Sequence, residues 1–293
     1  KDTSMSLNKL LELRDEMLQS VPSEGSFFDV IPGLSLHRRE CRTRCEIENY
    51  RPRVVIVVQG HKTAKIDGIH QSLYCAGDCL AAGFELPDGD HFLEGSKEVP
   101  YLCISYELNE DLVQEMLIKM GAHIEDKLVS DVSEKASNEL LDVFRRLLIA
   151  MRSPTERKFL IPILEEEIHF RVLSGSLGSF FRQVYTPERP YARVMKAIDF
   201  IRKNYDRRHN IETLSELACM SPTSFHRHFK AFTGISPKQF QKVLRLKEAQ
   251  RLISEEKFSC RKAALLVGYE NQSQFNREFK AFFGRTPANP IRT

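Results

Sequence analysis

The sequence predicts an α+β fold with an N-terminal β-barrel, helices that flank the barrel, and an all-α C-terminal domain. Three observations support this prediction. Short extended segments alternate with turn residues between positions 27 and 108, apolar residues then recur at helical spacing, and a helical segment is duplicated near the C-terminus. The chain has 293 residues, of which 42% are hydrophobic, so two compact domains are expected.

The predicted strands of the N-terminal part are short and separated by tight turns. Glycine and Asx residues, such as Asp67-Gly68 and Ala76-Gly77-Asp78, supply the backbone conformations that these turns require. Several short strands at this spacing favour a small barrel or sandwich whose interior can hold a ligand. The predicted strands cover residues 27–31, 54–58, 63–66, 72–75 and 101–108.

Amphipathic helices are predicted to follow the strands and to pack beside the barrel. Pro154 and Pro162 are expected to start or break these helices, and Gly175 and Gly178 to end the last of them. The apolar residues recur with a period of 3.6 across residues 112–120, 140–149 and 159–173.

Charge is divided unevenly along the chain. Residues 1–189 carry 23 Lys and Arg against 31 Asp and Glu, a net charge of −8, whereas residues 190–293 carry 20 against 9, a net charge of +11. The basic part is suited to a polyanion, and nucleic acid is its leading candidate partner. The segment VYTPERPY, where the charge changes sign, marks a domain boundary. The predicted domains are therefore a barrel with an N-terminal helix (1–107), a helical segment (108–185) and a basic helical domain (186–293).

Other sequence features bear on location and redox state. No apolar stretch approaches the roughly 18 residues needed to cross a bilayer, so no membrane partner is expected. The first residues lack the cationic start of a signal peptide, and the seven cysteines are an odd number. We therefore expect a cytoplasmic protein without disulfides.

The strongest pattern is a repeat at an offset of fifty residues. Residues 224–237 (SFHRHFKAFTGISP) and 274–287 (QFNREFKAFFGRTP) are identical at eight of fourteen positions without a gap. Each copy begins with a helix cap, Ser221 or Asn271, and ends with a glycine. Phenylalanines at i, i+4 and i+7 form one apolar face in each copy, which predicts two short helices with a polar outer face.

Each repeated helix follows another short helix, predicted at residues 211–218 and 259–267. Two short helices joined by a turn of three or four residues are typical of the helix-turn-helix, whose second helix enters the major groove of DNA. Between the copies, residues 237–253 form one predicted helix about 25 Å long. The chain is thus expected to contact two successive major-groove segments of double-stranded DNA, which lie about 34 Å apart.

Contact roles follow from side-chain chemistry. Arginine donates two hydrogen bonds to guanine, and Gln or Asn makes a matching pair with adenine. The predicted base-edge residues are Thr223, Ser224, His226, Arg227, Gln272, Ser273, Gln274, Asn276 and Arg277. Basic side chains add affinity through phosphate without sequence preference, and the predicted phosphate contacts are Lys230, Arg245, Lys247, Lys280 and Arg285.

The C-terminal motifs resemble those of the AraC/XylS family of bacterial transcription regulators. The resemblance rests on NIETLSELACMSPTSFHRHFKAFTGISPKQF, VLRLKEAQRLI and the pattern A-x-x-x-G-Y-x-x-Q-S-x-F-x-R-x-F-K at residues 264–280. It implies a double helix-turn-helix domain that binds promoters and activates, or sometimes represses, transcription through RNA polymerase. It also implies that the residues matching Thr223, His226, Arg227, Ser273, Gln274 and Arg277 face bases.

The N-terminal half is similar to the cupin-like domain of one subgroup of that family. The matching segments are RPRVVIVVQGHK, YCAGDCLAAGFELP, PYLCISYELN and LEEEIHFRVLSG. This resemblance implies a sensor or dimerisation domain, with a small-molecule effector or a second copy of the chain as partner. From strand position, the candidate pocket residues are Gln59, Lys62, Tyr74, Phe84, His91 and Tyr101.

Alternative functions remain open for the barrel. A cupin metalloenzyme requires converging histidines and a carboxylate, whereas this region offers only His61, His70 and His91 without an H-x-H pair. We therefore expect no metal, no cofactor and no enzymatic activity. The barrel could instead be a dimerisation module alone. A third alternative is a sensor of electrophiles or redox state, which would use Cys41, Cys45, Cys75, Cys79 or Cys103.

Overall fold

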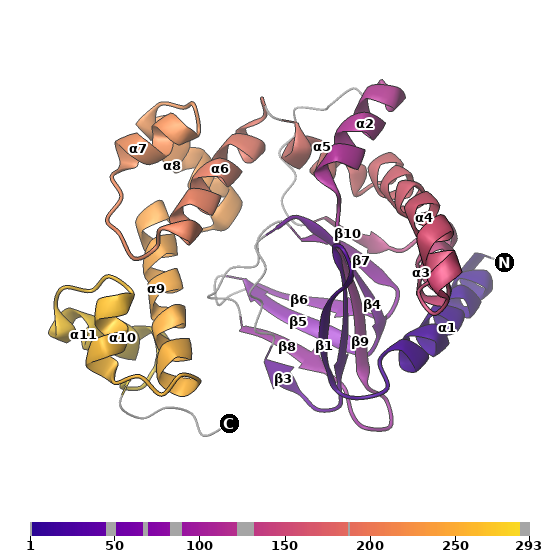
Figure 1. The fold of residues 1–293 in the computed structure, drawn as a ribbon, viewed down its shortest axis with the longest axis horizontal. Helices are drawn as coiled ribbons and strands as arrows, with labels where there is room; N and C mark the ends of the chain where they lie inside the picture. Colours follow the sequence, from indigo (N-terminus) through magenta and orange to yellow (C-terminus); the bar gives the residue numbers. More distant parts are fainter. Residues whose placement is uncertain are drawn as a thin grey trace. The chain divides into compact units, whose positions relative to one another are not determined.

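The computed structural model describes residues 2–44, 51–66, 70–82, 90–121, 132–186 and 188–287. The chain divides into two compact units between residues 186 and 187, inside the proline-containing segment VYTPERPY. Each unit is built around its own buried core. The first unit combines strands with helices, and the second unit is entirely helical in its described residues (Figure 1).

The strands of the first unit form two antiparallel sheets. In the larger sheet the order is β1 (Gly25–Ile31), β2 (Leu34–Arg39), β9 (Tyr101–Glu107), β4 (Arg53–Gln59), β7 (Asp78–Ala82) and β10 (Val132–Lys135). The smaller sheet has the order β3 (Thr43–Arg44), β8 (Asp90–Glu94), β5 (His61–Ile66) and β6 (His70–Cys75). The predicted α+β class is confirmed. Within the described residues the strands form two separately hydrogen-bonded sheets instead of one closed barrel.

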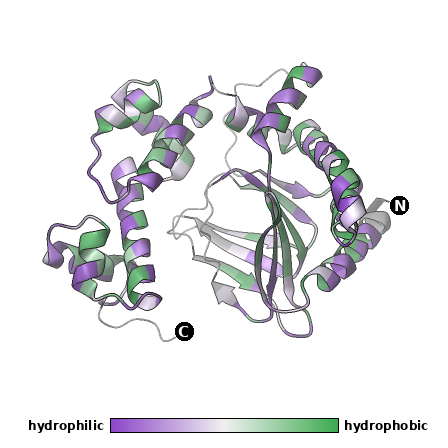
Figure 2. Ribbon diagram, viewed as in Figure 1, coloured by the Kyte–Doolittle hydropathy of each residue, from purple (hydrophilic) through white to green (hydrophobic). Residues whose placement is uncertain are grey.

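The two sheets enclose an apolar core, and the central strands β4 and β9 of the larger sheet are buried on both faces. Val55 and Val57 of β4 pack with Leu93 of β8 and with Tyr101 of β9 between the sheets. On the opposite face, Tyr106 of β9 contacts helices of the first unit. This double burial explains the unbroken apolar run of β4, which is typical of a strand covered on both sides. The strands of the larger sheet are correspondingly rich in hydrophobic residues (Figure 2).

Three helices cover the outer face of the larger sheet: α1 (Asp2–Ser20), α3 (Asn138–Ala150) and α4 (Pro154–Ser174) (Figure 1). Tyr106 packs edge-on against Phe144 of α3 and against His169 of α4, at ring distances of 5.8 and 5.9 Å. Two shorter helices, α2 (Glu110–Met120) and α5 (Gly178–Tyr185), pack beside α4.

The structure differs from the sequence prediction at one proline of helix α4 and at one glycine after it. Pro154 begins the helix as predicted, but Pro162 lies inside it and does not break it. An interior proline costs about 3 kcal/mol through its missing N–H and the clash of its ring, and the burial of Ile161 and Ile168 on the same helix offsets that cost. Gly175 ends α4 as predicted. Gly178 instead begins α5, where a Cβ would lie 2.1 Å from a backbone carbonyl.

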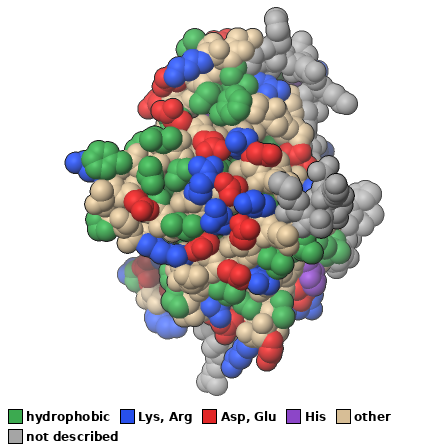
Figure 3. Space-filling view, turned by 90° about the vertical axis from the view of Figure 1, so that its right-hand side faces the viewer, with side chains coloured by type: hydrophobic (Ala, Val, Ile, Leu, Met, Phe, Trp, Pro, Cys, Tyr) green, Lys and Arg blue, Asp and Glu red, His purple; other side chains and the backbone are tan. Residues whose placement is uncertain are grey.

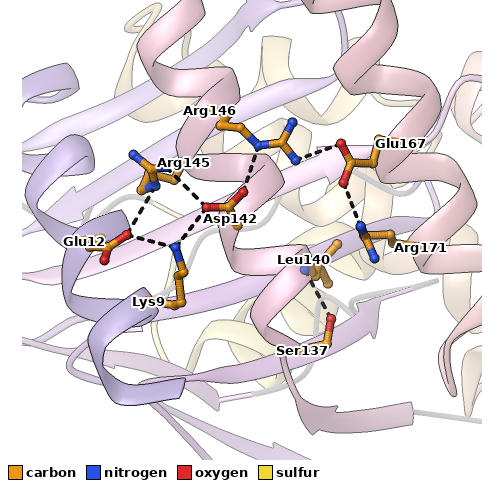
Figure 4. Close-up of polar contacts among 9 residues, drawn as sticks. All are labelled: Lys9, Glu12, Ser137, Leu140, Asp142, Arg145, Arg146, Glu167 and Arg171. Carbon is orange, nitrogen blue, oxygen red and sulfur yellow. Dashed lines mark hydrogen bonds and ion pairs between the residues drawn. The ribbon is translucent and has the colours of Figure 1, made fainter. Parts of the chain in front are cut away.

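An ion-pair network joins the three covering helices at the surface. Figure 3 shows basic and acidic side chains interleaved over the centre of one face, and Figure 4 shows how the network lies across the helices. Arg146 of α3 donates to Asp142 at 2.8 Å and to Glu167 of α4 at 2.7 Å, while Lys9 of α1 lies 3.2 Å from Asp142. Burial acts to raise the pKa of Asp142, but the hydrogen bonds from Arg146 and Lys9 outweigh it and lower this pKa to about 2. The network therefore remains ionised at neutral pH.

In the second unit a long central helix carries a helix pair at each end. This central helix is α9 (Pro237–Ser254) (Figure 1). Near its start lie α7 (Ile211–Leu217) and α8 (Pro222–Thr233), where Phe229 packs against Phe240 of α9 at 5.6 Å. Near its end lie α10 (Cys260–Leu266) and α11 (Gln272–Phe283), which share one core with the second half of α9. A further helix, α6 (Pro190–Lys203), packs against α8.

Candidate nucleic-acid interface

Helices α8 and α11, which we call the recognition helices, have matching ends. The Ser221 hydroxyl accepts from the backbone N–H of Ser224 at 3.3 Å, and the Asn271 side chain accepts from the N–H groups of Ser273 and Gln274. Both helices end at a glycine with positive φ, +75° at Gly234 and +71° at Gly284. The predicted caps and stops are confirmed. They give each helix twelve residues with defined limits.

The two recognition helices bury equivalent faces. Phe225 and Phe229 of α8, and Phe275 and Phe279 of α11, are buried. Phe232 and Phe282, which complete the predicted stripe, are only partly buried because they lie near the helix ends. The opposite face of each helix is therefore turned to solvent.

The predicted base-edge residues lie mostly on these solvent faces. Arg227 and Arg277 occupy equivalent positions and are both exposed, as are Thr223, His226, Ser273, Gln274 and Asn276, while Ser224 and Gln272 are partly buried. The amides on α11 are already engaged within the helix. Gln272 donates to Asn276 at 3.1 Å, and Gln274 donates to the Glu278 carboxylate at 3.0 Å.

Among the predicted phosphate contacts, Arg245 has a different position from the others. Lys230 and Lys280 are exposed, and Lys247 and Arg285 are partly buried. The Arg245 guanidinium points inward and donates to three backbone carbonyls: Tyr205 at 2.6 Å, Arg207 at 2.9 Å and Gly268 at 3.0 Å. Burial lowers its pKa, although the group stays charged. The structure therefore does not support Arg245 as a phosphate contact, because its donors hold loops together inside the unit.

The same region brings the loop before α7 into direct contact with the turn between α10 and α11. Gly268, in the turn before α11, has φ +84°, and a Cβ there would lie 1.9 Å from the Asp206 carbonyl in the loop before α7. Gln241 of α9 donates to the Tyr205 carbonyl at 2.9 Å in the same loop. The spacing between the recognition helices is therefore fixed by backbone contacts as well as by α9.

Sequence reasoning missed Tyr269 and Glu278. The Tyr269 hydroxyl donates to one oxygen of Glu278 at 2.8 Å, and Gln274 donates to the other oxygen. The i, i+4 spacing of Gln274 and Glu278 is a signal that could have indicated their contact. Nothing in the local pattern indicates Tyr269, which reaches Glu278 across the turn.

The candidate pocket residues in the first unit are only partly brought together. Lys62 is buried and lies opposite Tyr74 and Leu93 in the strand register, so it faces the core between the sheets, where Tyr101 also lies. Gln59 instead donates to the Pro100 carbonyl at 2.8 Å. Phe84 lies outside the described residues, and for His91 the structure describes the backbone of β8 alone.

The cysteines differ in burial. Cys79 and Cys103 are buried, and burial raises the pKa of the Cys79 thiol, which opposes formation of a reactive thiolate. Cys41 and Cys75 are exposed, and Cys45 lies outside the described residues. Over the described ranges, no three His, Cys, Asp or Glu side chains gather into a group that could hold a metal ion.

Comparison with known proteins identifies both units. Residues 30–180 match the family model for the N-terminus of AraC-type transcriptional regulators. The chain belongs to this family. Residues 214–292 of this AraC-type regulator match a helix-turn-helix domain, which confirms the predicted function class. It is a transcriptional regulator with an N-terminal regulatory domain and a C-terminal DNA-binding domain.

Relatives of this AraC-type regulator match either most of the chain or a shorter stretch of it. The XylDLEGF operon transcriptional activator 1 of Pseudomonas putida is 24% identical over 289 residues, covering 89% of this chain and 82% of that protein. A helix-turn-helix-type regulator of Haemophilus influenzae is 37% identical over 79 residues, 27% of this chain and 26% of that protein. The crystal structure of an apo ToxT variant from Vibrio cholerae shares the fold at 10% identity, with a TM-score of 0.53 over 87% of this chain and 96% of that chain.

No helix in the part of the chain that the structure describes is long and apolar enough to span a membrane.

Proposed function

We propose that this regulator binds promoter DNA by placing α8 and α11 in two successive major-groove segments. The observation that carries the proposal is the equivalent exposure of Arg227 and Arg277 on two helices with matching caps and buried phenylalanine faces. Arg227 and Arg277 donate to guanine, and Lys230 and Lys280 contact phosphate. The net charge of +11 over residues 190–293 attracts the duplex.

The contrast between an arginine and a lysine on α11 tests these contact roles. Arg277→Ala is expected to weaken specific binding by about 1 to 3 kcal/mol and to relax one base position. Lys280→Ala should weaken binding to all sequences alike. It should also reduce the slope of log affinity against log salt concentration by about one, the value for one lost phosphate contact. The measurement is the Kd of the full chain for selected and random duplexes over a series of salt concentrations. Equal effects of both variants on specific and random DNA would refute the assignment.

The N-terminal domain, in this proposal, controls when both recognition helices engage the promoter. A small-molecule effector would bind between the two sheets of the barrel region (1–107), close to Lys62, Tyr74 and Tyr101. Its binding shifts the population of states in which both helices contact DNA, and contact with RNA polymerase then changes transcription. The regulator acts by binding and carries out no enzymatic step.

We also propose that the helical segment 108–185 forms a homodimer through α4. Phe159, Ile163 and Phe170 share one face of α4 and are 60%, 63% and 47% exposed, which is unusual for large apolar side chains that lie together. The charges on α4 suit an antiparallel pairing with a second copy. Lys158 lies in the first half of the helix and Glu166 in the second, so a two-fold axis near Ile163 brings opposite charges together.

Substitution at that axis tests the dimer. Ile163→Asp places two carboxylates beside each other and is expected to weaken dimerisation of the full chain at least tenfold, or about 1.4 kcal/mol. Thr155→Asp adds the same charge near the start of α4, away from the axis, and should leave dimerisation unchanged. Sedimentation equilibrium measures both. A monomeric wild-type chain, or a dimer that tolerates Ile163→Asp, would exclude this interface.

A further inference from the structure

The Glu278 carboxylate lies on the second recognition helix between two donors that occupy different oxygens. Tyr269 donates to Oε2 at 2.8 Å, and the Gln274 Nε2 donates to Oε1 at 3.0 Å. An ionised carboxylate accepts hydrogen bonds and cannot donate them, so the Gln274 amide has to turn its nitrogen toward Glu278. The Glu278 carboxylate therefore determines which way the Gln274 amide is turned.

The side chain of Tyr269 is held in place by packing in the core of the second unit. It is 7% exposed, and its ring packs edge-on against Phe275 at 5.2 Å. The Arg245 guanidinium lies 5.9 Å from the ring centre and also binds the carbonyl of neighbouring Gly268. Burial, together with the hydrogen bond to Glu278, raises the pKa of Tyr269, so its hydroxyl stays protonated and continues to donate. Glu278 is thus anchored to the rigid interior of the unit.

The exposed end of Gln274 then presents one fixed pattern. A primary amide has two hydrogens. Glu278 can bind the one directed away from the amide oxygen, which leaves Oε1 and the second hydrogen side by side on the outer edge. Adenine offers a matching donor and acceptor in the major groove, its N6 amino group and N7. Guanine offers two acceptors there, O6 and N7, and the amide oxygen repels O6. A free glutamine can turn so that only its NH2 group faces O6 and N7, whereas a glutamine whose NH2 group is held by Glu278 cannot.

We infer that Tyr269 and Glu278 are positioning residues that fix the Gln274 amide and make the second recognition helix favour adenine over guanine at the base it contacts. The inference rests on the proposed function, in which the outer face of α11 enters the major groove.

The first recognition helix has no counterpart of this arrangement. The residues at the equivalent positions, fifty residues earlier, are Cys219, Ser224 and His228. The His228 ring stacks on Phe232 at 6.0 Å. Ser224 has a short hydroxyl side chain, so this position has no amide group whose orientation could be fixed. Base preference on the α8 side therefore serves as an internal control within the same molecule.

The test begins with the full chain and a library of random duplexes, from which bound sequences are selected. The base pair contacted by Gln274 is the one whose preference disappears in Gln274→Ala. Kd is then measured for the duplexes carrying adenine and guanine at that position. The wild type is expected to prefer adenine by about 5- to 150-fold, the range of one matched pair of hydrogen bonds.

Two variants release the amide without removing it. Glu278→Gln supplies a side chain that donates as well as accepts, and Tyr269→Phe keeps the packed ring but removes its donor. We expect the ratio of adenine to guanine affinity to fall at least threefold in Glu278→Gln and to fall less in Tyr269→Phe, with preferences on the α8 side unchanged. Glu270→Gln removes a neighbouring exposed charge from the same unit and should leave the ratio unchanged.

Two results would contradict the positioning role of Tyr269 and Glu278. If Gln274→Ala leaves every base preference intact, or if Glu278→Gln keeps the full ratio, the positioning role is wrong. The ratio is insensitive to the general gain in affinity that follows loss of a negative charge near DNA, because both duplexes share that gain. Failure of the proposed function is detected separately, since in that case Arg277→Ala would also leave base preference unchanged.

Discussion

Gly268→Ala is expected to destabilise the second unit by about 2 to 6 kcal/mol. The residue has φ +84°, where a non-glycine residue costs about 1 to 3 kcal/mol. Its new Cβ would lie 1.9 Å from the Asp206 carbonyl, and relieving such an overlap in packed structure costs a similar amount. Because the Asp206 oxygen belongs to the backbone and the Cβ is fixed directly to the backbone at residue 268, the loop before α7 and the turn before α11 would have to separate. Specific DNA binding should be lost together with stability.

Gly284→Ala is the matched control for this substitution. Gly284 has φ +71°, but a Cβ there meets no atom within 4 Å, so only the conformational cost of about 1 kcal/mol applies. Hydrogen exchange of the full chain, measured by mass spectrometry, gives the local free energy of opening for α9, α10 and α11 in both variants. If both substitutions cost the same, the close contact between Gly268 and Asp206 does not hold the helix pairs together.

The largest loss of DNA affinity is expected when both recognition arginines are removed. Arg227→Ala and Arg277→Ala each remove a predicted pair of hydrogen bonds to guanine, worth about 1 to 3 kcal/mol. The two residues lie on separate helices at opposite ends of α9, so their effects should add to about 2 to 6 kcal/mol (Figure 1). Competition binding of the full chain to a selected duplex measures the single and double variants.

The control for this pair is a charge removed elsewhere in the basic domain. Arg261 is exposed on α10, the first helix of its pair, and Arg261→Ala should lower the affinity for specific and random DNA by the same factor. The arginine variants should instead reduce specific binding selectively. A double variant that retains the selectivity of the wild type would show that these side chains do not contact bases.

Local features of the second unit could be predicted from sequence because they depend on neighbouring residues. The caps at Ser221 and Asn271, the stops at Gly234 and Gly284 and the buried phenylalanine faces all follow from patterns within a few residues. The role of Arg245 could not be predicted in this way. Its three carbonyl partners lie 23 to 40 residues away, so nothing in α9 alone separates it from a solvent-facing basic residue.

In the first unit, too, strand limits and the directions of the candidate pocket residues could be predicted only in part from the sequence. The apolar run that forms β4 was recognisable, whereas β7 begins at Asp78, a residue that the turn pattern assigned to the connection before it. Lys62 faces the core only because β5 pairs with β6 and β8 in one register. Gln59, one position beyond the buried run of β4, turns instead to the Pro100 carbonyl. Such pairings depend on residues far apart in sequence.

The central claim is that the two recognition helices contact two separate segments of one DNA duplex. It is tested most directly by comparing the sequences that the wild-type full chain and the single variants Arg227→Ala and Arg277→Ala select from a random library. We predict two preferred blocks in the wild-type profile about one helical turn, or roughly 10 base pairs, apart. Arg227→Ala should flatten one block and Arg277→Ala the other. A single preferred block, or two variants that flatten the same block, would contradict the claim.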